Sequence, residues 1–389
     1  MRSRTSLTIS SSQVQQWALS WLCDAIKLKD HGWKCTATVV WSIVLRAAAQ
    51  LTSVRAACRD LSNGPSDQAV MTALEAGLPK TLRALENQLH AALTNHIPTR
   101  VRKRSWPVAI DWHLVPYYGR PLASPNELYR SKPSHGTTKF HAYATACIVW
   151  HGVRYTVAAT WVRRHETAIV VLRRLLARLR ALGLKIRRLL LDAAFYSFPV
   201  TTLLQGECIP FLMPAVIRGR RPKPGNPATG LRAIRRRGAG WYPHVLVRRR
   251  QQVRLSICVA YRSYKHHRDG RQKSRKLLFA AWRVHGDPTD IREMYRRRFG
   301  IESSYRQRRQ ARIVTSSRNP HLRLLYIVVA LLLRNLWVWI HEQLLSEGRV
   351  EDLTVHLELL RFRRMLDWIR WEVVAAFHDG SPPCVVIED

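Results

Sequence analysis

Residues 106–111 read Trp-Pro-Val-Ala-Ile-Asp, and residues 186–192 read Ile-Arg-Arg-Leu-Leu-Leu-Asp. Each stretch is an apolar run of strand length that ends on a carboxylate, Asp111 in the first and Asp192 in the second. No other Asp lies between positions 68 and 268. Ligand sites in α/β sheets form at strand ends, and two carboxylates there suit Mg²⁺, which prefers hard oxygen ligands. The pair therefore predicts a metal-binding site.

The segments around these two strands alternate between strand and helix patterns. A hairpin is expected at His151-Gly152, and Gly183 closes an amphipathic helix. The expected order is β, β, β, α, β, α, β, which is typical of an RNase H-like mixed sheet with helices on its faces. Besides the two opening strands, the expected elements are strands at Phe140–Trp150, Val153–Val162 and Ile209–Val216, and helices at His165–Leu182 and Phe198–Gln205.

The regions that flank this alternating segment have different sequence patterns. Residues 1–100 carry helical periodicity, and Asn63-Gly64-Pro65 breaks them before a cap at Ser66 or Asp67. A helix-turn-helix DNA reader and a plain helical bundle both fit this region. The expected helices there are Val14–Leu28, Val39–Leu61 and Ala69–Leu93.

Residues 218–286 read as a basic, β-rich insertion, and the chain end reads as helical. Asp287-Pro288 is expected to start a helix. The strands expected in the insertion are Trp241–Val247, Val253–Tyr261 and Leu277–Val284; the later helices are Leu322–Leu345 and Val355–Phe377, with a loose end at 379–389. The predicted domains are a helical DNA-end-binding domain at 1–100, a catalytic core at 101–217 and 287–345, the insertion at 218–286, and a C-terminal helix and tail at 346–389.

The charge balance points to a polyanionic partner. Lys and Arg number 64 against 26 acids, which gives a net charge of +38. The basic residues are spread along the whole chain, which favours a long nucleic-acid groove over a membrane surface, although a general Arg bias can supply part of the excess. Seven scattered cysteines without a CxxC pair argue against zinc and disulfides and fit a cytoplasmic protein. The charges within Leu322–Leu345 favour a buried core helix over a membrane span.

A third candidate carboxylate lies on a helix expected at Asp290–Gln310. At about 100° per residue, Tyr295, Arg298, Glu302 and Arg309 fall within an arc of roughly 60°. The flanking cations would keep Glu302 ionised, as a metal ligand must be, and could hold phosphates. The alternative is a solvated basic helix in which Glu302 pairs incidentally with Arg298 or with Arg306.

Three motifs, spread over about residues 105–340, resemble one family of enzymes. The pattern Tyr295-x2-Arg298-x3-Glu302-x6-Arg309 resembles the Tyr-Arg-Glu-Lys signature of insertion-sequence transposases in the DDE superfamily. Ile110-Asp111 with Pro-Tyr-Tyr-Gly at 116–119 resembles the first-Asp region, and Leu-Leu-Leu-Asp-Ala-Ala-Phe-Tyr at 189–196 resembles the second. Arg309 departs from the pattern, which usually has Lys there; the charge is kept and the geometry is altered.

The resemblance implies an RNase H-like core and cut-and-paste chemistry with Mg²⁺ (or Mn²⁺), as two ions. By that analogy, Asp111 bridges both metals while Asp192 and Glu302 hold one each. It implies that Tyr295 and Arg298 contact phosphate near the cut. The remaining DNA-binding candidates are Arg306, Arg309, and Trp241 or Trp282 as a base-stacking residue, although each Trp fits a strand or core position better.

The expected partners are double-stranded DNA with terminal inverted repeats and target DNA, bound by a homodimer, with no membrane. The expected location is the cytoplasm of a prokaryote, on the nucleoid. Three alternatives stay open: another RNase H-like nuclease, an inactive domesticated transposase that only binds DNA, and a basic RNA-binding protein. No RRM-like, KH-like or zinc-knuckle motif supports the last.

Overall fold

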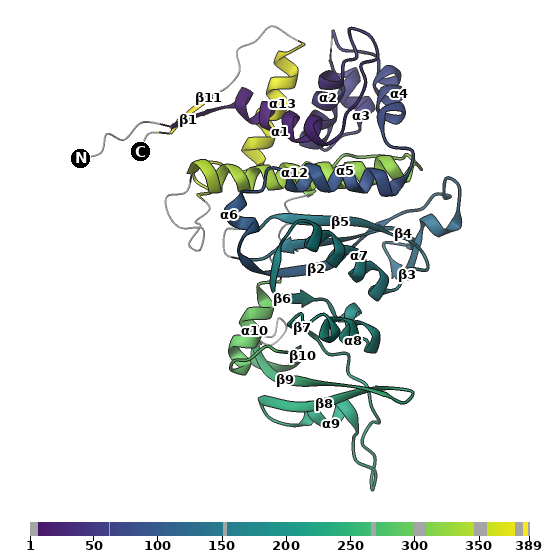
Figure 1. Cartoon of the computed structure of the whole chain (residues 1–389), viewed down its shortest axis with the longest axis vertical. Coiled ribbons are helices and arrows are strands. Elements are labelled where there is room, and N and C mark those ends of the chain that lie inside the picture. The colour runs from purple at the N-terminus through teal and green to yellow at the C-terminus, as the bar shows by residue number, and fades with distance from the viewer. Residues whose placement is uncertain are drawn as a thin grey trace, which may run out of the picture.

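The computed structural model describes residues 7–61, 63–150, 154–265, 270–298, 309–345, 356–377 and 384–387. Figure 1 shows an elongated molecule, with a helical bundle at one end, a large sheet in the middle and a β-rich extension at the other end. The helices are α1 (Ser11–Ala25), α2 (Ala37–Gln50), α3 (Val54–Arg59), α4 (Asp67–Gly77), α5 (Leu82–Thr94), α6 (Thr99–Arg102), α7 (Ala168–Ala181), α8 (Phe198–Gly206), α9 (Gly230–Arg236), α10 (Pro288–Arg296), α12 (Pro320–Ile340) and α13 (Phe362–Ala375).

The central sheet is mixed, as the sequence predicts. Strands β2, β6 and β7 are parallel, and the other pairs are antiparallel. The strand order is β3-β4-β2-β6-β7-β10-β9-β8, with β5 paired to β4. The strands are β2 (Ser105–Pro116), β3 (Tyr129–Ser134), β4 (Thr137–Ile148), β5 (Thr156–Val162), β6 (Lys185–Leu191), β7 (Phe211–Pro214), β8 (Gly240–Arg248), β9 (Gln251–Lys265) and β10 (Gln272–Trp282).

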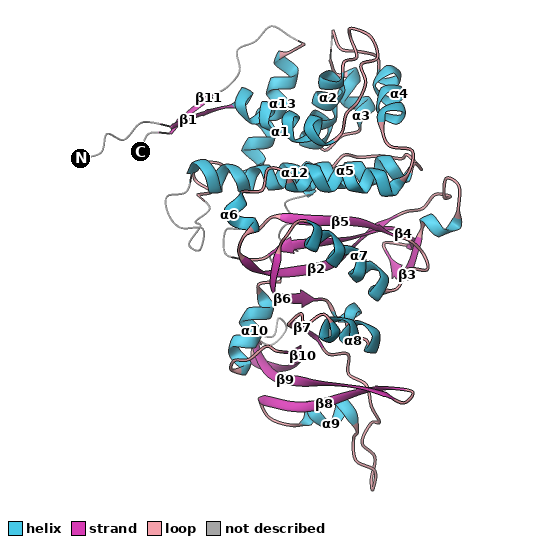
Figure 2. Ribbon diagram, in the orientation of Figure 1, coloured by secondary structure: helices cyan, strands magenta, loops and turns pink. Residues whose placement is uncertain are grey.

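The strands of the basic segment 218–286 continue this sheet. Strand β10 pairs antiparallel with β7, and β9 and β8 follow it outward. Figure 2 shows the β9–β10 and β8–β9 pairs extending away from the helical end. The extension therefore begins where β10 pairs with the edge of β7, beside α10.

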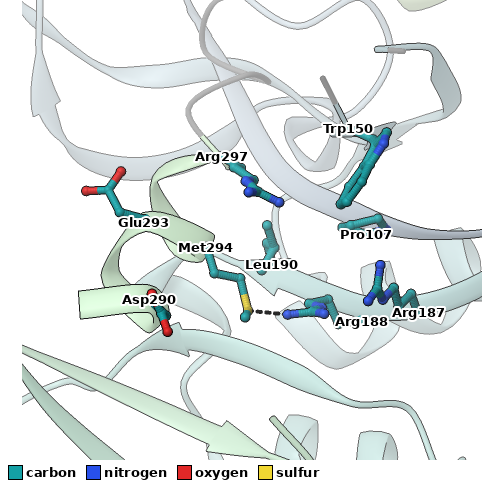
Figure 3. Close-up of a pocket in the computed structure, with 9 residues that line it drawn as sticks. All are labelled: Pro107, Trp150, Arg187, Arg188, Leu190, Asp290, Glu293, Met294 and Arg297. Atoms are coloured by element: carbon teal, nitrogen blue, oxygen red, sulfur yellow. Dashed lines mark hydrogen bonds between the residues drawn. The ribbon is translucent and has the colours of Figure 1, made fainter. Parts of the chain in front are cut away.

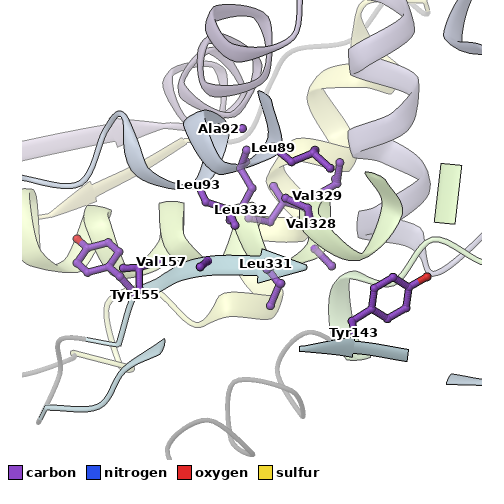
Figure 4. Close-up of a cluster of buried hydrophobic side chains, with 14 of the residues drawn as sticks. Leu89, Ala92, Leu93, Tyr143, Tyr155, Val157, Val328, Val329, Leu331 and Leu332 are labelled. Carbon is purple, nitrogen blue, oxygen red and sulfur yellow. The ribbon is translucent and has the colours of Figure 1, made fainter. Parts of the chain in front are cut away.

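Helices α5 and α12 cover the sheet on the side of the helical bundle. Leu89 and Leu93 of α5 pack with Val328 and Leu332 of α12 over Val157 of β5 (Figure 4). All five side chains are buried because each helix turns an apolar stripe toward the same strand. The helical end and the sheet thus share one hydrophobic core.

Polar side chains from these helices cover the free edge of β5, which pairs with β4 alone among the described strands. Glu86 of α5 accepts a hydrogen bond from the Trp161 backbone N–H at 2.8 Å. His90 Nε2 accepts one from the Ala159 N–H at 3.1 Å. A buried strand edge needs such partners because its backbone groups have no water to bind.

The helical N-terminal region follows the predicted pattern with two corrections. The single helix predicted at Val39–Leu61 is wrong: α2 ends at Gln50, its C-cap Leu51 has a left-handed φ of 59°, and α3 follows. The helix predicted at Ala69–Leu93 is also two helices, α4 and α5. The cap at Ser66 is confirmed, since its Oγ accepts from the Ala69 N–H at 3.2 Å.

The chain ends differ from the prediction as well. The segment 379–389 is not wholly loose, because β11 (Cys384–Ile387) pairs antiparallel with β1 (Leu7–Ser10). Helix α13 begins at Phe362, later than predicted. The helix Pro320–Leu345 is long enough and apolar enough to cross a membrane. However, 89% of its most apolar stretch is buried inside the protein. It is the core helix that the sequence predicts.

Acidification is expected to destabilise the fold through two buried histidines. Burial lowers the pKa of both His90 and His141 to about 3, well below the unfolded value of about 6.5. Only the unfolded chain takes up these protons between pH 6.5 and 3, so the stability present above pH 6.5 is lost as the pH falls. From pH 7 to pH 5 we expect a loss of roughly 2 kcal/mol per histidine in urea unfolding.

The substitution His141→Phe removes one titrating group and keeps a buried ring against Tyr117, whose centroid lies 4.6 Å away. The pH-dependent part of the loss should then fall by about half. An equal loss in wild type and variant would show that His141 does not carry it.

Candidate active site

Asp111 and Asp192 lie side by side on neighbouring parallel strands. Strands β2 and β6 pair in register up to Ile110 and Leu191, and each Asp is the next residue. Adjacent strands lie about 4.8 Å apart, so the two carboxylates start from the same level of the sheet. This juxtaposition is the one that the two apolar runs predict.

Both carboxylates belong to the sheet face that α10 covers. Ala109 and Leu190, two residues earlier on the same strands, belong to a buried cluster with Ile291 of α10. Side chains two residues apart on a strand share a face. Asp111 and Asp192 therefore point to the α10 side, away from the core formed by α5 and α12.

The end of β2 differs from the prediction. The strand does not end on Asp111 but continues to Pro116, pairing with β4 throughout. Only the parallel pairing with β6 stops there. Asp111 therefore sits inside a long strand, at the level where its neighbour ends.

Asp111 is almost buried and ion-paired. One of its oxygens, Oδ1, accepts a hydrogen bond from the Trp112 N–H at 2.9 Å. The other, Oδ2, lies 3.2 Å from Nη1 of Arg298, and the two side chains are only 12% and 7% exposed. A buried carboxylate requires such a cation, because isolated buried charge is costly. The sequence places Arg298 beside Glu302, so the partner found here was not foreseen.

Asp192 is more open than Asp111. It directly follows β6 and begins the short 3₁₀ helix Ala193–Phe195. Its Oδ1 accepts from the Ala193 N–H at 2.7 Å, which fixes the carboxylate at the turn. The side chain is half-buried, so the carboxylate can reach a ligand above the sheet.

Tyr295 anchors α10 to the same strand end. Its hydroxyl donates to the Leu191 carbonyl at 3.1 Å, and its ring lies 5.0 Å from that of Phe279. The Arg298 guanidinium carbon lies 5.5 Å from the Tyr295 ring centroid. Burial raises the pKa of Tyr295, and Asp192 and Asp111 raise it further, so the phenol stays neutral. In this arrangement Tyr295 positions Arg298 toward Asp111.

The helix predicted at Asp290–Gln310 is shorter in the structure. It starts at Pro288 behind the cap residue Asp287, as expected, but α10 ends at Arg296 and Arg298 lies in the following turn. Glu302 and Arg306 lie outside the described residues, and Arg309 opens a short 3₁₀ helix. One continuous helix face therefore does not explain the grouping of these residues.

The two candidate tryptophans are half-buried strand residues. Trp241 of β8 donates its ring N–H to the Gly286 carbonyl at 2.8 Å. Trp282 ends β10 in register with Phe211, and the Arg283 guanidinium carbon lies 4.4 Å from its ring centroid. Both positions suit strand packing, and base stacking by either one stays a prediction.

The donor chemistry at this strand end fits a hard divalent cation. Asp111 and Asp192 supply carboxylate oxygens on one face, the ligand type that Mg²⁺ and Mn²⁺ take. Within the described ranges, no three His, Cys, Asp or Glu side chains gather to form a complete site. Two of the three predicted ligands are thus brought together, and the third, Glu302, lies outside those ranges.

Comparison with known proteins agrees with this geometry. The family model for the transposase DDE domain matches residues 102–336, which include both aspartates and the segment with Glu302. The fold is similar to that of piggyBac transposase, from a cryo-EM structure of its synaptic complex with hairpin DNA. The TM-score is 0.55 at 12% sequence identity, over 95% of this chain and 78% of that one. No curated protein matches the sequence.

Proposed function

Because the chain belongs to the family of transposases with a DDE domain, we propose that it cuts DNA at the ends of an insertion sequence and joins them to a target. The observation that supports this most is the register of β2 and β6, which sets Asp111 and Asp192 level with one another on one sheet face. Phosphodiester transfer needs paired carboxylates of this kind because they hold divalent cations against the reacting phosphate.

In this proposal Asp111, Asp192 and Glu302 hold Mg²⁺ (or Mn²⁺), as two ions. The bound metal would supply Lewis-acid stabilisation of the phosphate charge and a more acidic attacking water. Arg298 neutralises Asp111 in the free protein, and its guanidinium can instead hold a DNA phosphate by paired hydrogen bonds. Tyr295 keeps this guanidinium at the strand end.

The proposed partners follow from the charge of the chain. A net charge of +38 suits a long duplex contact, and the structurally similar piggyBac transposase was solved with hairpin DNA. We extend the proposal to terminal inverted repeats and target DNA bound by a homodimer, and to a cytoplasmic, nucleoid-associated location in a prokaryote.

The proposal is tested with the DNA that flanks the gene. Purified protein is incubated with Mg²⁺, linear DNA carrying both flanks, and a supercoiled plasmid. Cleavage at the flanks and covalent joining to the plasmid are expected. Random nicking without joining would instead indicate another nuclease, and binding without cleavage would indicate an inactive DNA-binding relative.

Replacing Arg298 should weaken both binding and chemistry. Arg298→Ala removes a buried guanidinium that is placed to contact phosphate and leaves Asp111 without its cation. We expect cleavage to slow by about 10²-fold, the size of one lost charge-stabilising donor, and end binding to weaken several-fold. Cleavage rate and DNA affinity are measured separately on the same end fragment.

Arg296→Ala, at the last residue of α10 and two positions before Arg298, is the matched control. Its side chain is 74% exposed and pairs with Glu293 rather than with Asp111. It should cleave at close to the wild-type rate. If Arg298→Ala also cleaves normally, Arg298 does not belong to the site.

A further inference from the structure

A cavity lies on the same face of the sheet as the two carboxylates. It measures about 260 Å³ and is formed between the end of α10, strand β6 and the start of β2. Trp150, Pro107 and Leu190 give it apolar walls, and Arg187, Arg188 and Arg297 give it three guanidinium groups (Figure 3). Asp111, Asp192, Tyr295 and Arg298 do not line it.

Two of the three guanidinium groups lie over one aromatic ring. The guanidinium carbon of Arg187 lies 5.8 Å from the Trp150 ring centroid, and that of Arg297 lies 5.3 Å from it. Arg188 reaches into the cavity and donates to the Met294 sulfur. None of the three arginines forms an ion pair with another residue in the described part of the chain. The cavity is therefore an arginine cluster held by stacking, not by carboxylates.

Acidic side chains at the rim do not neutralise this cluster. Glu293 lines the cavity but is ion-paired to Arg292 and Arg296. Asp290 is exposed and, in Figure 3, lies with Glu293 at the far side of the view from Trp150. The cluster thus keeps an excess of positive charge.

The arginines also repel one another. Burial lowers the pKa of Arg188, and the charges of Arg187 and Arg297 lower it further. An anion placed between the three groups would relieve this repulsion and accept several charge-assisted hydrogen bonds. A planar fork of donors on an apolar wall suits the phosphate and sugar of a DNA strand.

The distance between the cavity and the carboxylates corresponds to a few base-pair steps of duplex DNA. Arg188 is four residues before Asp192 on β6, so both face the α10 side, about 13 Å apart along the strand. That length is roughly four base-pair steps of a duplex at 3.4 Å each. The end of α10 serves both places, because Tyr295 and Arg298 face the carboxylates while Met294 and Arg297 face the cavity.

We propose that the cavity of Trp150, Arg187, Arg188 and Arg297 binds one backbone phosphate of duplex DNA, several base pairs from the bond cut at Asp111 and Asp192. Its role as a register point for the cut rests on the proposed function. Phosphate binding by the cavity does not rest on that function, and it is tested without measuring DNA cleavage or joining.

The test is the salt dependence of binding to a random-sequence 30-base-pair duplex, in EDTA, by fluorescence anisotropy. Loss of one phosphate contact flattens the slope of log K against log salt by about 0.9. Arg187→Gln/Arg297→Gln should show that change, so its affinity deficit should shrink about threefold between 50 and 200 mM salt. Arg187→Lys/Arg297→Lys keeps the charge and should keep the wild-type slope.

The matched control is Arg364→Gln/Arg370→Gln on α13, at the helical end. These arginines also lie over tryptophan rings, with guanidinium carbons 5.7 Å from Trp368 and 6.0 Å from Trp371, and their loss removes the same charge. An unchanged slope is expected. Equal flattening in both double variants would overturn the proposal, since it would reflect net charge alone, and so would an unchanged slope in the Gln pair. Catalytic failure of the wild-type protein would leave this result intact and count only against the proposed function.

Discussion

Asp192→Asn is expected to abolish cleavage and strand transfer while DNA binding persists. Asparagine keeps the shape of the side chain, and its Oδ1 can still accept the hydrogen bond from the Ala193 N–H at 2.7 Å that starts the turn. Only the negative charge that would hold the metal is lost. Several kcal/mol of transition-state stabilisation disappear with it, which corresponds to a rate loss on the order of 10³-fold or more.

The measurement is joining of pre-cut element ends to a plasmid, with duplex affinity measured in parallel. Asp367→Asn, a half-exposed residue of α13 paired to Arg363, is the control and should join ends normally. Asp111→Asn and Glu302→Gln should match Asp192→Asn in rate, but Asp111→Asn also removes the ion pair with Arg298 and should lower stability. Near wild-type joining by Asp192→Asn would remove Asp192 from the active site.

The sequence predicts those features of this site that depend only on the local pattern of residues. An apolar run of strand length followed by a carboxylate requires only neighbouring residues, and it located Asp192 at the end of β6. The same reasoning ended β2 too early. The strand continues through Trp112, His113 and Leu114, where it is held by pairing with β4.

The sequence did not predict contacts between segments that are far apart in the chain. The ion pair of Arg298 with Asp111 joins positions almost two hundred residues apart, and it depends on how α10 docks against β6. The arginines at 187 and 188 did carry a signal, since paired charges within an apolar strand need a reason, but their contacts, Trp150 for Arg187 and Met294 for Arg188, lie on other segments.

Helix boundaries show the same division. The break between α4 and α5 has a local mark in Pro79 and the cap Thr81, whose Oγ1 accepts from the Ala84 N–H at 3.3 Å. The break after α2 also has a cap, Ser53, whose Oγ accepts from the Ala56 N–H at 3.0 Å, but its turn depends on Leu51, which adopts a left-handed φ of 59° that leucine rarely takes. Tertiary packing fixes that turn, so only the structure reveals it.

Asn335→Ala is expected to cause a large loss of stability for a single side chain. Asn335 is fully buried on α12. Both the oxygen and the nitrogen of its side-chain amide form hydrogen bonds with the edge strand β5. Its Oδ1 accepts from the Thr156 N–H at 2.8 Å, and its Nδ2 donates to the Thr156 carbonyl at 2.8 Å and to the Leu93 carbonyl at 3.2 Å. This one amide ties the core helix to the sheet and to α5.

Alanine at position 335 leaves three buried backbone groups without that partner and opens a cavity. Each unsatisfied group costs about 1–3 kcal/mol, so a loss on the order of 4 kcal/mol is expected in urea unfolding. Asn87→Ala on exposed α5 surface should change stability by only about 0.5 kcal/mol or less. If the two variants unfolded alike, the Asn335 amide would not be what joins helix and sheet. A large difference would show that this one buried amide is a main link between the helical end and the sheet that carries Asp111 and Asp192.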